Sequence, residues 1–140
     1  MLFPKKVKYR KWQTARRNPK RPFFETRGVS LAFGSYGLKA LSLGRIRSNQ
    51  LEAARKTIAR EIKKTGKLWI RVFPDRPFTQ KPAEVKLGKG KGDVVGYQAE
   101  VKPGRIIFEI DGLAEELSRD VLRRAGAKLP VKTRVVSRNH

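Results

Sequence analysis

Net positive charge is the feature that most constrains this chain. Its 140 residues include 34 lysines and arginines against 12 acidic residues, a formal net charge of +22. A compact monomer with this charge repels itself, so its folded state favours a polyanionic partner. Nucleic acid is the first candidate, because neutralised phosphates release their counterions. An anionic membrane is the second, but no apolar run approaches the roughly 20 residues that span a bilayer.

The length and the rare residues exclude several classes of site. The length suits one ordinary domain with its own core. There is no cysteine, which excludes disulfides, thiolate metal sites and cysteine nucleophiles. The one histidine, His140, is the last residue, and terminal residues are usually poorly ordered. We therefore expect no metal site and no cofactor. The basic start lacks the pattern of a secretory signal, so we expect a reduced, cytosol-like compartment.

Residues 1–27 are predicted to form a basic N-terminal arm, ahead of a single domain at 28–140. Ten residues of the arm are Lys or Arg, one is acidic, and five aromatic residues are interspersed among them. This mixture suggests that part of the arm packs on the domain or stacks on RNA bases. The alternative is an ordinary packed extension without a binding role.

Apolar periodicity predicts the order ββαβ, a long loop, and ββαβ again. Strands are expected at 29–34, 36–44, 67–73, 94–101, 105–110 and 128–138, with helix as an alternative for 36–44. Helices are expected at 48–66 and 111–126, where apolar residues recur at three- and four-residue spacing. Asn49 and Glu52 fit a capping box at the start of the first helix. These elements predict an α+β fold in which two helices pack on a mostly antiparallel sheet.

A turn and a long Gly/Lys loop flank the strand at 94–101. Pro103 and Gly104 fit the central positions of a type II turn, which predicts a β-hairpin between this strand and the next. Residues 74–82 contain three prolines and are predicted to be turn and loop. Together with the residues that follow, they make a protruding loop at 74–93.

The stretch KLGKGKGD, residues 86–93, raises the question of phosphate binding. A Walker loop starting at Gly88 needs glycine five residues on, where Asp93 stands, and no Gly-Lys-Ser/Thr sequence follows. The stretch precedes a strand, whereas such motifs bind anions at the start of a helix. A nucleotide-hydrolysing enzyme is therefore disfavoured. A cationic finger for a nucleic-acid backbone and a plain flexible loop both remain open.

The remaining patterns favour RNA over DNA and over catalysis. Glu115 and Glu116 lie in the first turn of a helix, where acidic residues favour the helix dipole, and the serines have no plausible base. The chain has no zinc-finger spacing, no leucine heptads and no convincing helix-turn-helix motif. An extended arm, interspersed aromatics and a glycine finger suit the irregular surface of a folded RNA. A general DNA-compacting protein is the alternative.

Seven stretches now point to a family. They are, in order, MLFPKKVKYRK, FGSYGLKAL, QLEAARKTIAR, GKLWIRVFPDRP, KPAEVKLGKGKG, VKPGRIIFEIDG and KLPVKTRVV. In these stretches, and through nearly its whole length, the chain resembles the bacterial-type large-subunit ribosomal protein L-sixteen family (universal L-sixteen / L-ten-e). The resemblance implies a two-helix α+β fold and a structural, non-enzymatic constituent of the large subunit. It further implies binding of large-subunit rRNA near the aminoacyl-tRNA site, contact with tRNA, and support of late subunit assembly and translation.

The resemblance also implies partners and site residues. Expected partners are large-subunit rRNA, tRNA in the aminoacyl site with peptidyl-site tRNA as a further candidate, and neighbouring large-subunit proteins, without a membrane or a homo-oligomer. The ribosome would be that of the cytoplasm or of an organelle. The arm residues implied to contact RNA are Lys5, Lys6, Lys8, Tyr9, Arg10 and Lys11. Lys81 is likewise expected to bind RNA, and it begins the loop implied to approach tRNA. The tRNA-proximal residues of that loop are Lys86, Gly88, Lys89, Gly90, Lys91 and Gly92.

Further cations are expected to bind RNA on charge alone, namely Arg16, Arg17, Arg45, Arg55 and Arg60. A solvated helix face is the alternative for the last two. The chain departs from the family pattern at two places. Lys86 stands where the family usually has arginine, so the planar fork that makes bidentate phosphate contacts is missing. Residues 13–28 replace a stretch that is often glycine-rich, which leaves the contacts of residues 13–27 open.

Overall fold

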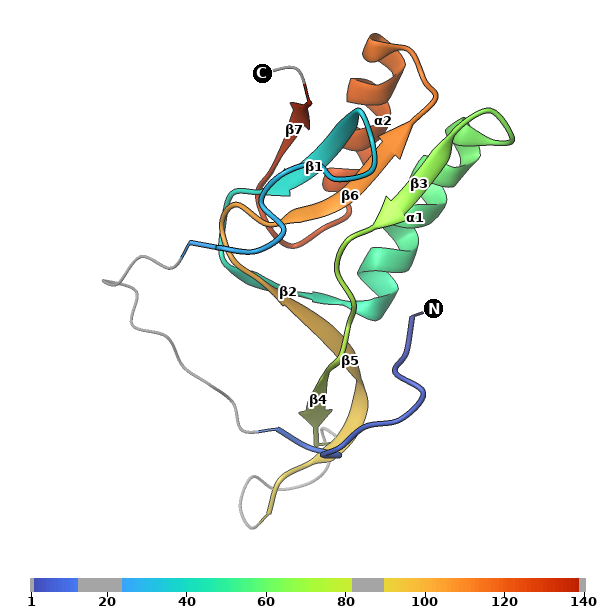
Figure 1. Cartoon of the computed structure of the whole chain (residues 1–140). Coiled ribbons are helices and arrows are strands. Elements are labelled where there is room, and N and C mark those ends of the chain that lie inside the picture. The colour runs from blue at the N-terminus through green and yellow to red at the C-terminus, as the bar shows by residue number, and fades with distance from the viewer. Residues whose placement is uncertain (1, 13–23, 82–89, 139–140) are drawn as a thin grey trace.

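The computed structural model in Figure 1 describes residues 2–12, 24–81 and 90–138. Five of the candidate site residues lie outside these ranges, namely Arg16, Arg17, Lys86, Gly88 and Lys89. The described elements confirm an α+β fold with two helices. They are β1 (Tyr36–Ala40), β2 (Gly44–Arg47), α1 (Ser48–Ile62), β3 (Lys67–Ile70), β4 (Arg76–Gln80), β5 (Asp93–Val101), β6 (Ile106–Asp111), α2 (Glu115–Gly126) and β7 (Thr133–Ser137).

Within the described ranges, the strands form two sheets. Sheet A has the order β3-β6-β1-β7 and sheet B the order β2-β5-β4. Every pairing is antiparallel, as predicted. Both helices lie on one face of sheet A, and sheet B extends away from them toward the N-terminal arm (Figure 1). The molecule therefore has a helix-covered half and a more open half.

The core lies between the helices and sheet A. The stripe of α1 that its spacing predicts is buried, at Leu51, Ala54, Ile58 and Ile62. The helices meet the sheet residues Leu38, Phe108 and Ile110, each at most 1% exposed. Burial of such a side chain contributes about 1.5–3 kcal/mol. Because side chains alternate along a strand, Glu109, which lies between Phe108 and Ile110, faces the other side of sheet A.

The first helix begins at a different cap from the one predicted. Gln50 Oε1 accepts a hydrogen bond from the backbone N–H of Arg47 at 2.8 Å, just before the first helical residue, Ser48. The predicted capping box of Asn49 and Glu52 is wrong, because the helix starts two residues earlier than that box requires. Glu52 instead accepts hydrogen bonds from the guanidinium of Arg55.

The segment 29–34, predicted to be a strand, forms a loop around a buried carboxylate. The backbone N–H groups of Ala32, Phe33 and Gly34 all donate to Oε1 of Glu109, at 2.9, 2.9 and 3.0 Å. Successive N–H groups of a strand point in alternate directions, so three in a row cannot serve one acceptor. The strand prediction is wrong because this acceptor, distant in sequence, determines the backbone conformation of the segment.

The carboxylate of Glu109 is itself fully buried on the helix-free face of sheet A. Its other oxygen, Oε2, accepts a hydrogen bond from the guanidinium of Arg71. Burial raises the pKa of Glu109, but the hydrogen bonds from Gly34, Arg71 and the neighbouring N–H groups outweigh it and hold this pKa below its ordinary value. The charged carboxylate therefore fastens the 29–34 segment to the sheet.

The turn after β5 forms as predicted, but the hairpin does not. Gly104 has a φ of 102°, which glycine adopts readily, and the N–H of Arg105 donates to the carbonyl of Lys102 at 3.2 Å. However, β5 pairs with β2 and β4, whereas β6 pairs with β1 and β3. The turn thus carries the chain from sheet B to sheet A, and the predicted ladder between its two strands is wrong.

Two further boundaries differ from the sequence prediction. Residues 76–80, expected to be loop, form β4, which includes Pro77. β4 is an edge of sheet B, where a proline's missing N–H need not interrupt a ladder. The stretch 36–44, predicted as one strand, divides into β1 in sheet A and the start of β2 in sheet B.

Candidate nucleic-acid interface

The N-terminal arm begins against the junction of sheet B and α1. The carbonyl of Leu2 accepts a hydrogen bond from Ser48 Oγ at 2.7 Å. The ring of Phe3 meets the ring of Tyr97 edge to face, with centroids 6.1 Å apart. These contacts fix the start of the arm, as the packed-extension interpretation requires for this part.

The described end of the arm also contacts sheet B. The guanidinium of Arg76 lies 5.5 Å from the ring centroid of Trp12, within cation–π range. Arg76 is only 8% exposed, and its NH1 lies 3.7 Å from a carboxylate oxygen of Glu100. The carbonyl of Trp12 accepts a hydrogen bond from the ammonium group of Lys91. The segment 2–12 of the arm is therefore held at both of its ends.

Between these two contacts the arm presents cations to solvent. Residues 2–12 carry five Lys or Arg residues and no acidic residue. Lys5, Lys6, Lys8 and Arg10 are exposed, and Lys11 is half-buried. Tyr9 is 62% exposed, so its ring, which lies 5.5 Å from Lys8 Nζ, can still stack on a base. An anchored backbone with free cations loses less conformational entropy on binding a polyanion than a free tail does.

The described part of the Gly/Lys loop starts and ends next to the arm. Lys81 is half-buried at the end of β4, and Gly92 lies against Gln80. Gly90 has a φ of 84°, a conformation that favours glycine, and the space around it is open. The contact of Lys91 with Trp12 joins loop and arm. The structure thus brings together two basic segments that are 79 residues apart in sequence.

The cations predicted on β2 and α1 are partly engaged within the protein. Arg45 Nε lies 3.7 Å from a carboxylate oxygen of Glu100. Arg55 is hydrogen-bonded to Glu52, which lowers the pKa of Glu52 and raises the pKa of Arg55. Arg60 is exposed on α1. Of these three, Arg60 is the one whose charge faces solvent most openly.

The sequence reasoning missed two residues that hold the arm. Trp12 was one aromatic among several in the arm, and nothing in the sequence indicated which of them would anchor it. Arg76 stood in a stretch whose prolines predicted a loop, so it gave no sign of being buried in an edge strand. The described residues contain no group of three or more acidic or histidine side chains that could hold a metal ion. Within the same ranges, neither helix is long and apolar enough to cross a membrane.

Comparison with known proteins decides the class. A family model described as "Ribosomal protein L16p/L10e" matches residues 4–136. The chain belongs to this family. The "Large ribosomal subunit protein uL16" of Psychrobacter cryohalolentis is 51% identical over 138 residues, which cover 99% of this chain and 98% of that relative. The resemblance inferred from the seven sequence stretches is thereby confirmed.

Membership of the L16p/L10e family gives the chain a general role. The chain is a structural ribosomal protein of the large subunit, and rRNA binding and a part in translation follow from the family. This family consists of structural proteins, which supports a function other than catalysis. The anchored arm and the base of the Gly/Lys loop are accordingly the candidate RNA-contacting surface.

Proposed function

We propose that the protein binds large-subunit rRNA near the aminoacyl-tRNA site, contacts tRNA through its Gly/Lys loop, and supports late subunit assembly. One observation carries this proposal. The arm is fixed to sheet B at Leu2 and Trp12 and presents its cations between them. The loop base at Lys91 adjoins the same anchor. A single surface can therefore contact rRNA with the arm and reach further with the loop.

Phosphate contacts would supply most of the affinity, and RNA shape the specificity. With roughly 6–10 such contacts, affinity is expected to fall about 10³–10⁵-fold between 50 and 200 mM salt, if the slope for duplex DNA applies. The exposed ring of Tyr9 adds a stacking surface for an unpaired base. Large-subunit rRNA would then be preferred over a regular duplex that hides its bases.

Co-sedimentation of the full chain with large subunits in a sucrose gradient tests the proposal. We expect the protein in the large-subunit fractions, and weaker retention when Lys5, Lys6 and Lys8 are replaced by alanine. The matched control replaces three exposed lysines elsewhere, Lys56, Lys64 and Lys128. Recovery of the unaltered chain only among free proteins would overturn the proposal. Equal competition by duplex DNA and an rRNA fragment would favour DNA compaction instead.

The loop is tested separately from the arm. Replacement of Lys86, Lys89 and Lys91 by alanine is expected to reduce translation by reconstituted ribosomes while the melting temperature of the free chain changes little. The reason is that charged lysine side chains rarely contribute to an apolar core. A large fall in the melting temperature would show that the loop is a structural element rather than a contact for tRNA.

A further inference from the structure

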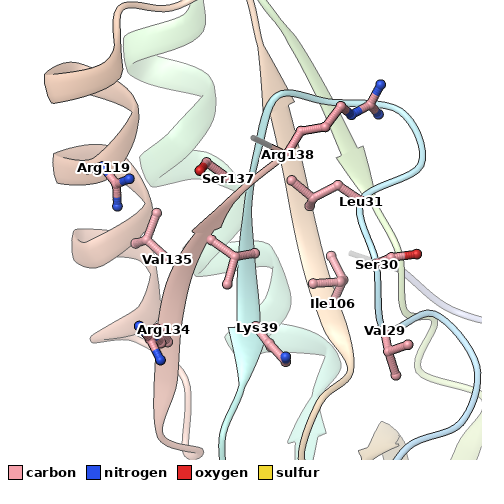
Figure 2. Close-up of a pocket in the computed structure, with 11 residues that line it drawn as sticks. Val29, Ser30, Leu31, Lys39, Ile106, Arg119, Arg134, Val135, Ser137 and Arg138 are labelled. Atoms are coloured by element: carbon pink, nitrogen blue, oxygen red, sulfur yellow. The ribbon is translucent and has the colours of Figure 1, made fainter. Parts of the chain in front are cut away.

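A second basic site lies on sheet A, away from the sheet that holds the arm. A groove of about 450 Å³ follows the edge strand β7, and we call it the edge groove (Figure 2). Its lining includes the cations Lys39, Arg119, Arg134 and Arg138 and no acidic residue. None of these four residues was among the RNA-binding candidates that the sequence suggested.

Two of these cations repel each other in the free protein. Lys39 and Arg134 are direct partners in the antiparallel register of β1 and β7. Like charges in directly opposed positions destabilise a pair of strands. Among the described residues, neither side chain makes a hydrogen bond or an ion pair, and the same holds for the side chain of Arg138. Only Arg119 has an acidic neighbour, Glu115, at 3.3 Å. An anion bound in the groove would relieve this repulsion.

The shape of the groove suits more than a single phosphate ion. Figure 2 shows Lys39 and Arg134 near one end of β7 and Arg138 at the other. Arg138 follows Arg134 by four positions in the sequence, which is roughly 13 Å of extended chain. The side chains of Val29, which is 40% exposed, and Leu31 form an apolar part of the lining. The volume lies within the range of about 300–1,000 Å³ typical of sites for small organic ligands.

We propose that the edge groove binds a stretch of RNA backbone, independently of the arm and the Gly/Lys loop. Phosphates contact Lys39, Arg134 and Arg138, and the sugar or base of one nucleotide lies against Val29 and Leu31. A row of cations beside an apolar surface matches a chain that alternates phosphates with sugars and bases. This inference rests on the proposed function in one respect: the RNA would be large-subunit rRNA.

A tethered probe tests the location directly. The chain has no cysteine, so Ser30→Cys, in the exposed lining of the groove, gives a single attachment point for an iron–EDTA cleavage reagent. After incorporation of the full chain into large subunits that lack it, we expect strong, localised cleavage of the rRNA. Thr65→Cys, an exposed position by β3 at the opposite edge of sheet A, is the matched probe and should give a different or weaker pattern.

A charge variant tests the energetics. The double substitution Lys39→Gln and Arg134→Gln is expected to weaken binding to a large-subunit rRNA transcript and to reduce the salt slope of log K by about 1–2. The matched control removes two exposed charges outside the groove, with Arg123→Gln and Lys128→Gln. The groove variant should melt no lower than the unaltered chain, because it loses a repulsive pair.

The outcomes separate this inference from the proposed function. If the protein enters large subunits but the Ser30 probe leaves rRNA intact, the edge groove does not bind RNA and the proposed function stands. Equal effects of the groove and control variants would also overturn the inference. Cleavage of a neighbouring acidic protein segment by the Ser30 probe, without rRNA cleavage, would replace RNA by protein as the occupant. If the unaltered chain fails to enter large subunits, the proposed function itself has failed.

Discussion

Sheet A and sheet B differ in what covers them and in what their charges contact. Sheet A is packed under two helices, and its central strand β6 is buried from Ile106 to Ile110. Sheet B is half-buried along much of β5 and is covered in part by the arm, through cation–π and edge-to-face contacts. From this difference we infer that the helical half supplies most of the stability. The open half holds the basic segments in place for a partner.

The largest expected effect comes from a substitution that disrupts the core of the helical half. Phe108→Ala removes a fully buried ring beneath the helices and should lower the free energy of unfolding by about 3–5 kcal/mol. The matched substitution in sheet B, Phe78→Ala, removes a half-buried ring and should cost less than half as much. Urea unfolding of both variants measures the difference. Equal losses would mean that the two sheets contribute alike.

The next effect concerns Glu109, the buried carboxylate on the helix-free face of sheet A. Glu109→Gln removes the charge that holds Arg71 and the 32–34 backbone, and should cost about 1–3 kcal/mol at neutral pH. The folded-state pKa of Glu109 is lowered, so its contribution is fully present above the ordinary glutamate pKa, about 4.3, and is lost as pH falls through the lower folded value. The unaltered chain should therefore lose stability more steeply in acid than the variant. Parallel acid-melting curves would contradict this.

A smaller effect is expected when the urea unfolding of the two halves is followed separately by tryptophan fluorescence. The chain has two tryptophans, Trp12 at the arm anchor and Trp69 in β3 of sheet A, stacked on Phe33 with ring centroids 5.8 Å apart. In the variants Trp69→Phe and Trp12→Phe, the remaining tryptophan reports on one half. We expect the Trp12 fluorescence transition at roughly 0.3–1 M lower urea, if the arm opens with about 1 kcal/mol less free energy. Coincident transitions would show a single cooperative unit.

The smallest effect belongs to a surface ion pair of the helical half. Arg55→Ala removes the partner of Glu52 on α1 and should lower the free energy of unfolding by about 0.3–0.5 kcal/mol, because the pair is partly exposed and screened by solvent. If Arg55 also binds rRNA, the same variant weakens binding by more than this amount. Thermal melting and filter binding on one preparation separate the two roles.

Sequence periodicity predicted the helices and most strands, because their burial patterns are local. The stripe on α1 and the turn at Gly104 both follow from spacing and residue type. The strand partners could not be predicted, since alternation shows that β5 is half-buried without showing which sheet it joins. The 29–34 segment shows the same limit: its conformation depends on Glu109, more than 70 residues away. In the candidate interface, the cations were visible in the sequence, whereas the anchors Trp12 and Arg76 depended on tertiary contacts.

The hydrogen bond between Lys91 and Trp12 has a consequence for the order of events on the ribosome. It joins Trp12 of the arm to Lys91 at the base of the Gly/Lys loop. A partner that stabilises the arm in this position therefore also stabilises the base of the loop. Coupling of this kind is reciprocal. If rRNA binds the arm and tRNA binds the loop, tRNA binding raises the affinity of the arm for rRNA. By the same factor, rRNA binding raises the affinity of the loop for tRNA. A structural ribosomal protein would then act as a mechanical link between a permanent RNA and a transient one.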